Sequence, residues 1–93
     1  MKYGINLLLW TDSMHDGLIP TVEAIKSMGY DGVEMPLFDP NKQLYEEWGK
    51  KLDDIGLERT AVTIRGAEDN PISPSASVRS AAVDAMKKTI DCC

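Results

Sequence analysis

The stretch Ser27-Met-Gly29-Tyr-Asp-Gly-Val-Glu34 predicts the end of a helix, then a glycine, then the start of a strand. A second stretch, Asp54-Ile-Gly56-Leu-Glu-Arg-Thr-Ala61, repeats the same order of features. Glycine often follows the last turn of a helix because it adopts the left-handed conformation at little cost. The spacing of Gly29 and Gly56 suits one strand–helix unit. The repeat therefore predicts a chain built from βα units.

Working outward from the repeat gives three such units. The predicted strands are Gly4 to Leu9, Asp31 to Met35 and Glu58 to Ile64, and the predicted helices are Leu18 to Met28, one starting at Asp39-Pro40 and ending before Gly56, and one starting at Ser73-Pro74. Apolar residues recur at helical spacing in each helix. The stripes are Leu18, Val22, Ile25 and Met28; Leu44, Trp48, Leu52 and Ile55; and Val78, Ala82, Ala85, Met86, Thr89 and Cys93.

The alternation of strands and helices predicts a parallel sheet with right-handed crossovers. Strand faces favour a closed barrel over an open doubly wound sheet, since one face of each strand is aliphatic and the other carries polar groups near the strand's carboxyl end. The aliphatic sets are Ile5, Leu7 and Leu9; Val33 and Met35; and Val62 and Ile64. No glycine-rich phosphate-binding motif is present. We expect an α/β fold in which residues 1–93 form the N-terminal three βα units of a single (β/α)₈ TIM barrel, truncated after the third helix.

Composition excludes several classes of protein. Apolar residues make up 43% of the chain, which is enough for a packed core and argues against disorder. The net charge of −5 and the scattered Lys and Arg residues argue against nucleic acid and membrane partners. The first apolar stretch, Ile5 to Trp10, is too short for a membrane span and has no cleavage site of a signal peptide after it. We therefore expect a cytoplasmic protein, with Cys92 and Cys93 as ordinary helix cysteines.

Polar groups at strand ends are the candidates for function, because active sites of TIM barrels lie there. Glu34 is predicted either to bind a substrate hydroxyl or orient a metal ligand, or to form a structural ion pair with Arg65. Arg65 in turn could hold an anionic group. Asn6 is either a substrate contact or a satisfied core amide, and Trp10 either a wall for a sugar ring or a plug of the barrel mouth. His15 is expected to be a solvated loop residue.

The segments Met1-Lys-Tyr-Gly-Ile5, Ile25 to Glu34 and Asn70 to Arg79, together with Trp10, resemble the D-tagatose/D-allulose 3-epimerase family. That family belongs to the xylose isomerase-like barrels. The resemblance implies a metal-dependent isomerase or epimerase of a sugar or small hydroxy-ketone that acts through an enediolate. It also implies a divalent metal (Mn²⁺, Mg²⁺ or Co²⁺) held by Glu, Asp, His and Glu on later strands, outside this chain.

By this resemblance, the chain carries the edge of the substrate pocket and neither catalytic nor metal-binding residues. Trp10 and Glu34 match the family, whereas Asn6 stands where an aromatic residue is usual and Met14 where a second tryptophan is usual. Thr63-Ile64 occupies the place of a pair of small residues. The predicted substrate-binding residues are Asn6, Trp10, Glu34, Thr63 and Arg65.

Two other functions fit the same fold: an endonuclease IV-type DNA-repair barrel, which the charge disfavours, and a non-catalytic binding barrel. If the protein is a sugar isomerase or epimerase, its partner is a small sugar, and the complete enzyme is a candidate homo-oligomer. We expect the 93-residue chain alone to be inactive and weakly stable. Its first and third strands would be exposed edges, and its lumen face would be open to water.

Overall fold

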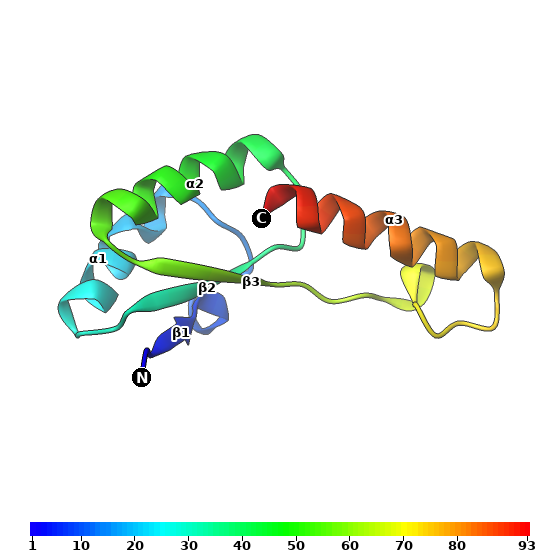
Figure 1. The fold of residues 1–93 in the computed structure, drawn as a ribbon, viewed down its shortest axis with the longest axis horizontal. Coiled ribbons are helices and arrows are strands. Elements are labelled where there is room, and N and C mark those ends of the chain that lie inside the picture. Colours follow the sequence, from blue (N-terminus) through cyan, green and yellow to red (C-terminus); the bar gives the residue numbers. More distant parts are fainter.

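Three parallel strands alternate with three helices in the computed structural model, which describes residues 1–93 (Figure 1). The strands are β1 (Gly4–Asn6), β2 (Gly32–Pro36) and β3 (Glu58–Val62), and the helices are α1 (Ile19–Ser27), α2 (Lys42–Ile55) and α3 (Ala76–Cys92). The sheet order is β1-β2-β3, and both pairings are parallel. The predicted α/β class and the three βα units are confirmed, and β1 and β3 are the edges of the sheet.

The two glycines of the sequence repeat end their helices as predicted. Gly29 has a φ of 95° and Gly56 a φ of 88°, both in the left-handed region. The Gly56 carbonyl also accepts a hydrogen bond of 3.0 Å from the Lys26 ammonium, so the end of α2 is tied to the end of α1.

The first strand is shorter than predicted. It stops at Asn6, and residues Leu7–Leu9 form a short 3₁₀ turn, η1. The Asn6 side chain accepts a hydrogen bond from the Leu8 backbone N–H at 2.8 Å, which caps the turn in place of further strand pairing. Leu7 remains fully buried, but the turn breaks the alternation of faces, so Leu9 is 70% exposed rather than buried under the helices.

Helices α2 and α3 begin later than predicted from their prolines. Asn41, and not Asp39, caps α2, because its side-chain oxygen accepts from the Leu44 N–H at 3.2 Å. Ser75 precedes α3, and Ser73 instead accepts from the Ser75 N–H in the turn before the helix. Both predicted starts were wrong, because the polar residue after each proline takes the N-cap position; Asn41 does so with a side-chain cap hydrogen bond and Ser75 without one.

The core lies between the sheet and helices α1 and α2. Its buried members are Leu7, Met14, Leu18, Val22, Ile25, Val33, Met35, Leu37, Tyr45, Trp48, Leu52 and Leu57. The stripe of α2 is confirmed, with Trp48 and Leu52 fully buried. Burial raises the pKa of Tyr45, whose hydroxyl donates to the Pro36 carbonyl at 2.6 Å and so fixes α2 to the end of β2. Met28, predicted to be part of the α1 stripe, is 71% exposed.

Helix α3 packs against the short 3₁₀ turn η3 (Ala67–Asp69), and most of its length extends beyond α1, α2 and the sheet (Figure 1). Only its last turns come close to α2, and there Cys92 packs against the core, where burial raises the pKa of its thiol. Ala82 and Thr89 are buried as predicted, whereas Met86 and Cys93 are exposed. No helix combines the length and the apolar character that a membrane crossing requires.

Candidate functional site

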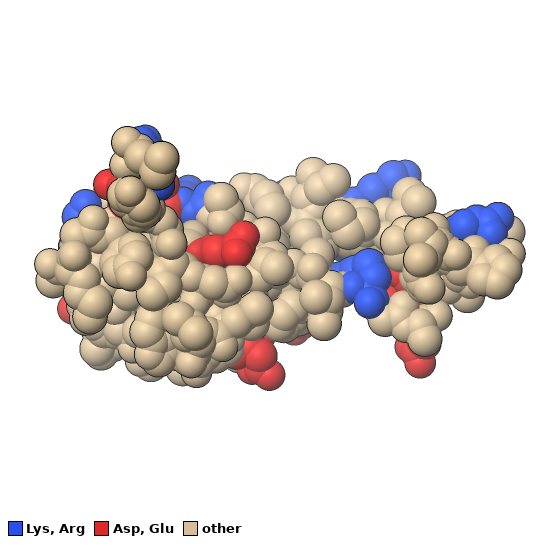
Figure 2. All heavy atoms as spheres, turned by 90° about the horizontal axis from the view of Figure 1, so that it is seen from below, with Lys and Arg blue, Asp and Glu red and all other residues tan.

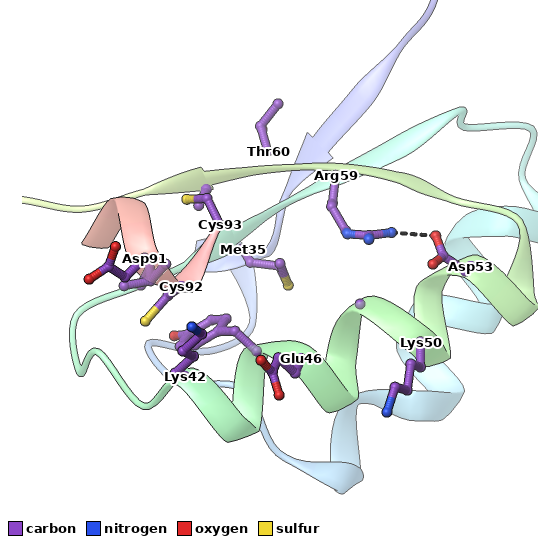
Figure 3. A pocket seen from close by; sticks show the side chains of 14 residues that line it. Met35, Lys42, Glu46, Lys50, Asp53, Arg59, Thr60, Asp91, Cys92 and Cys93 are labelled. Carbon is purple, nitrogen blue, oxygen red and sulfur yellow. Dashed lines mark hydrogen bonds and ion pairs between the residues drawn. The ribbon is translucent and has the colours of Figure 1, made fainter. Parts of the chain in front are cut away.

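A row of three polar residues crosses the sheet, one from each strand. Asn6 pairs in register with Glu34, and Glu34 pairs with Thr60. Their neighbours Val33 and Met35 are buried in the core, so the row lies on the opposite face of the sheet, away from α1 and α2. Figure 3 agrees, since Thr60 and Arg59 extend to opposite sides of β3.

Hydrogen bonds join the three side chains of this row. The Asn6 amide nitrogen donates to Glu34 Oε2 at 2.9 Å, and the Thr60 hydroxyl donates to Glu34 Oε1 at 3.2 Å. Asn6 and Glu34 are both half-buried. Each carboxylate oxygen can accept more than one hydrogen bond, and the Asn6 amide has a second N–H. The row can therefore bind hydroxyl groups of a ligand through both acceptors and a donor.

The row lines one edge of an open hollow of about 450 Å³ on the sheet surface, which extends from there toward the amino ends of the three strands. Beyond its carboxyl-end side, the η1 turn leads to Trp10, which is half exposed. In a parallel α/β barrel the carboxyl ends of the strands and the loops that follow them form the active site. Of the predicted site residues, Asn6 and Glu34 are brought together by their register and hydrogen bond, and Trp10 lies on the loop directly beyond Asn6, at the carboxyl end of β1.

Thr63 and Arg65 lie in a separate cluster. The Arg65 guanidinium donates to Asp69 at 2.9 Å and to the Thr63 hydroxyl at 2.7 Å, so the predicted ion pair between Arg65 and Glu34 is wrong. The side chain of Arg65 is 17% exposed, and its Nε atom is buried without a hydrogen-bond partner. Strand β3 ends at Val62, so both residues belong to the segment that leads away from the sheet.

Thr60 is the site residue that the sequence analysis missed. Aligning the repeat on Gly29 and Gly56 places Ala61 beside Glu34, but the strand register pairs Thr60 with Glu34. A shift of one residue exchanges the two faces of a strand. The predicted aliphatic face of β3 was therefore wrong: Val62 shares the face of Glu34 and Thr60, and Ile64 is 71% exposed. The alternation of polar Thr60 with apolar Ala61 in the sequence was the signal from which the face of Thr60 could have been predicted.

The other residues singled out in the sequence have structural positions. His15 is exposed in the loop before α1, as predicted. Met14 is 4% exposed and belongs to the core, so it does not line the hollow. Figure 2 shows a face on which Lys and Arg side chains are spread apart, without a continuous basic patch. This distribution does not resemble a DNA-binding surface.

A second cavity of about 610 Å³ lies on the helix side of the sheet, between α2, β3 and the end of α3 (Figure 3). Arg59 and Asp53 form an ion pair of 2.5 Å across it, and Lys42, Glu46 and Cys92 also line it. Its charges are mixed, and although Thr60 is also among its lining residues, the cavity lies on the opposite face of the sheet from the Asn6 and Glu34 side chains. No group of three or more His, Cys, Asp or Glu residues is arranged to hold a metal ion anywhere in the structure.

Comparisons with known proteins match this chain to one family and one fold. The family described as "Xylose isomerase-like TIM barrel" matches residues 22–93. A crystal structure of D-allulose 3-epimerase from Methylomonas sp. in complex with D-allulose superimposes with a TM-score of 0.84 at 20% identity, over 99% of this chain and 32% of that chain. A D-psicose 3-epimerase structure determined in the presence of D-fructose gives 0.75 at 23% identity, over 99% and 33%.

Because the sequence identities are low, these two structural similarities show the fold alone. The chain spans about a third of the length of each of the two solved structures. No curated protein matches the sequence.

Proposed function

The chain belongs to the xylose isomerase-like TIM barrel family, and on that premise we propose that it forms the first three βα units of a sugar isomerase or epimerase. The observation that carries this proposal is the hydrogen-bonded Asn6–Glu34–Thr60 row on the face of the sheet away from the helices, at the end of β1 and in the middle of β2 and β3. Two solved structures with this fold are 3-epimerases, one in complex with D-allulose and the other determined in the presence of D-fructose. Below, "the whole protein" means the complete barrel of this proposal.

Each site residue has a proposed role toward a ketose or a small hydroxy-ketone. Glu34 and Thr60 accept hydrogen bonds from hydroxyl groups, and Asn6 donates one through its second amide hydrogen. The half-exposed indole of Trp10 covers the apolar face of the sugar. Thr63 and Arg65, with Asp69, form a further polar cluster beyond β3 that contacts the substrate from the rim.

The proposed reaction moves a proton to and from the carbon next to a carbonyl, through an enediolate. Such a reaction needs an acid, a base and a group that stabilises the enediolate charge. Both oxygens of Glu34 already accept hydrogen bonds, which suits binding and orientation rather than proton transfer. We therefore assign the acid and base to strands beyond this chain.

The residues of this chain do not fit a metal site, because no cluster of carboxylates, imidazoles or thiolates is present. We propose that the whole protein uses a divalent ion, Mn²⁺, Mg²⁺ or Co²⁺, that residues outside this chain bind. We further propose that it acts in the cytoplasm on a free sugar, as a homo-oligomer, without nucleic acid or membrane partners.

Exchange of hydrogen with solvent tests this function. The whole protein, supplied with Mn²⁺, is incubated in D₂O with ketohexoses such as D-fructose, D-allulose and D-tagatose, and proton NMR follows the hydrogens next to the carbonyl. We expect deuterium at one such carbon and an epimer or isomer as product. Chelation with EDTA should abolish both, and added Mn²⁺ should restore them.

The matched control is the 93-residue chain alone with Mn²⁺, which we expect to leave every ketose unchanged. Absence of exchange with the Mn²⁺-loaded whole protein, across the ketohexoses and a smaller hydroxy-ketone, would contradict the proposed function. Exchange that persists at full rate in EDTA would contradict the metal dependence alone.

A further inference from the structure

The side-chain amide of Asn6 makes two hydrogen bonds at the end of β1. Its amide nitrogen donates to Glu34 Oε2 at 2.9 Å, and its amide oxygen accepts from the Leu8 N–H at 2.8 Å. The two ends of one side-chain amide therefore connect a carboxylate on β2 with the backbone of the η1 turn. Thr60 on β3 holds the other carboxylate oxygen.

The carboxylate of Glu34 selects the orientation of this amide. An ionised carboxylate only accepts hydrogen bonds, so the Asn6 amide must direct its nitrogen toward Glu34. Its oxygen is then left to accept from Leu8. A flipped amide would place its oxygen against the carboxylate and its N–H groups against the Leu8 N–H, with two repulsive contacts in place of two hydrogen bonds.

The η1 turn in turn sets the path of the loop that carries Trp10. The Leu7 carbonyl accepts from the N–H of Trp10 at 2.9 Å and from the N–H of Thr11 at 3.1 Å. Leu7 itself is fully buried and anchors the turn to the core. The start of this turn depends on the Asn6 cap, so the orientation of Asn6 affects the position of Trp10.

We propose that Glu34 is a positioning residue that acts through Asn6 to hold the η1 turn and Trp10 at the rim of the site. This inference deepens the proposed function, because Trp10 is the proposed wall for the sugar ring. Glu34 therefore orders the first βα loop before substrate arrives, in addition to any contact that it makes with the sugar.

Residue-resolved hydrogen exchange of the whole protein without substrate tests this proposal. In Glu34→Leu, the Leu8 amide should lose roughly 10- to 100-fold of its protection, as expected when a hydrogen bond to a charged group is removed from the network. The Leu57 amide, which donates to the Leu52 carbonyl at 2.9 Å in the core, should keep its protection. Glu34→Gln should rescue Leu8, because its amide oxygen can still accept from Asn6.

A matched variant on the same face of the sheet is Glu58→Leu, which removes only an exposed ion pair with Lys2 and should leave Leu8 unchanged. If Glu34→Leu does not fold, Thr60→Val provides the same test, with a smaller loss at Leu8 that Thr60→Ser prevents. Unchanged protection of Leu8, or an equal loss at Leu8 and Leu57, would overturn the positioning role.

Because exchange is measured without substrate, its outcome is independent of turnover. A local loss at Leu8 in a protein that converts no ketose would support the positioning role and contradict only the proposed function. If the whole protein converts a ketose normally but Glu34→Leu leaves the protection of the Leu8 amide unchanged, the proposed function is supported and only the positioning role is contradicted.

Discussion

Replacement of Trp48 by alanine is expected to lower the thermal midpoint of the whole protein by about 10 °C or more. Trp48 has no exposed surface and lies at the centre of the core between α2 and the sheet. Truncating a buried tryptophan lowers the free energy of unfolding by about 3–5 kcal/mol. Each kcal/mol corresponds to roughly 2–4 °C in the thermal midpoint of a protein of about 150–250 residues. The indole nitrogen has no hydrogen-bond partner, so the expected loss comes from packing and burial.

Trp10→Ala is the matched control for this variant, since the same side chain is removed from a half-exposed position on the η1 turn. Its effect on the free energy of unfolding should be small, within about 0.5 kcal/mol as for most surface substitutions, so the thermal midpoint should shift by about 2 °C at most. Differential scanning calorimetry of both variants and the wild type provides the comparison. Equal shifts for Trp48→Ala and Trp10→Ala would contradict the assignment of the core.

Gly32→Ala is the second variant with a large expected effect, because it forces β2 and β3 apart. A Cβ atom at residue 32 would lie 2.7 Å from the Glu58 carbonyl oxygen and 3.1 Å from the Glu58 carbonyl carbon. Both atoms belong to the backbone of β3, which pairs with Gly32 in register and cannot move away without loss of that pairing. Overpacking lowers the free energy of unfolding by about 1–3 kcal/mol where neighbouring side chains can adjust. We expect the upper end of this range here, because the clashing atoms belong to the backbone.

The displacement should also reach the site, since Thr60 lies two residues along β3 from Glu58 and hydrogen-bonds Glu34. Gly66→Ala is the control: the nearest atom to its new Cβ is Asp69 Oδ1 at 3.8 Å, an ordinary contact. Thermal unfolding of the two variants should differ by several degrees, with Gly32→Ala the less stable. A Gly32→Ala protein as stable as Gly66→Ala would show that the β2–β3 register is wrong.

The order of elements was predictable because each of its signals is local. Gly29 and Gly56 require a left-handed conformation, and the apolar stripe of α2 fixes which face is buried, so helix ends and the buried position of Trp48 follow from residues close in sequence. Asn6 and Glu34 were predicted correctly to share a face, since each is a single polar residue with an aliphatic residue on either side in the sequence. Three βα units of a barrel follow from these features.

Features that depend on competing hydrogen bonds or on strand register were not predictable. The apolar run Leu7–Leu9 reads as strand, but the Asn6 cap turns it into η1. The partner of Glu34 depends on how β3 slides along β2, and the sequence repeat is offset from that register by one residue. Arg65 was placed with Glu34 for this reason, although the nearby Asp69 is its actual partner.

The coding sequence that follows the codon for Cys93 tests directly whether this chain forms the first three units of a sugar isomerase or epimerase barrel. We expect five further βα units, since a TIM barrel has eight. We also expect Glu, Asp, His and Glu at the carboxyl ends of the later strands, as the resemblance to the 3-epimerase family implies. A stop codon directly after Cys93, or a continuation without strand–helix units and without those residues, would contradict this proposal.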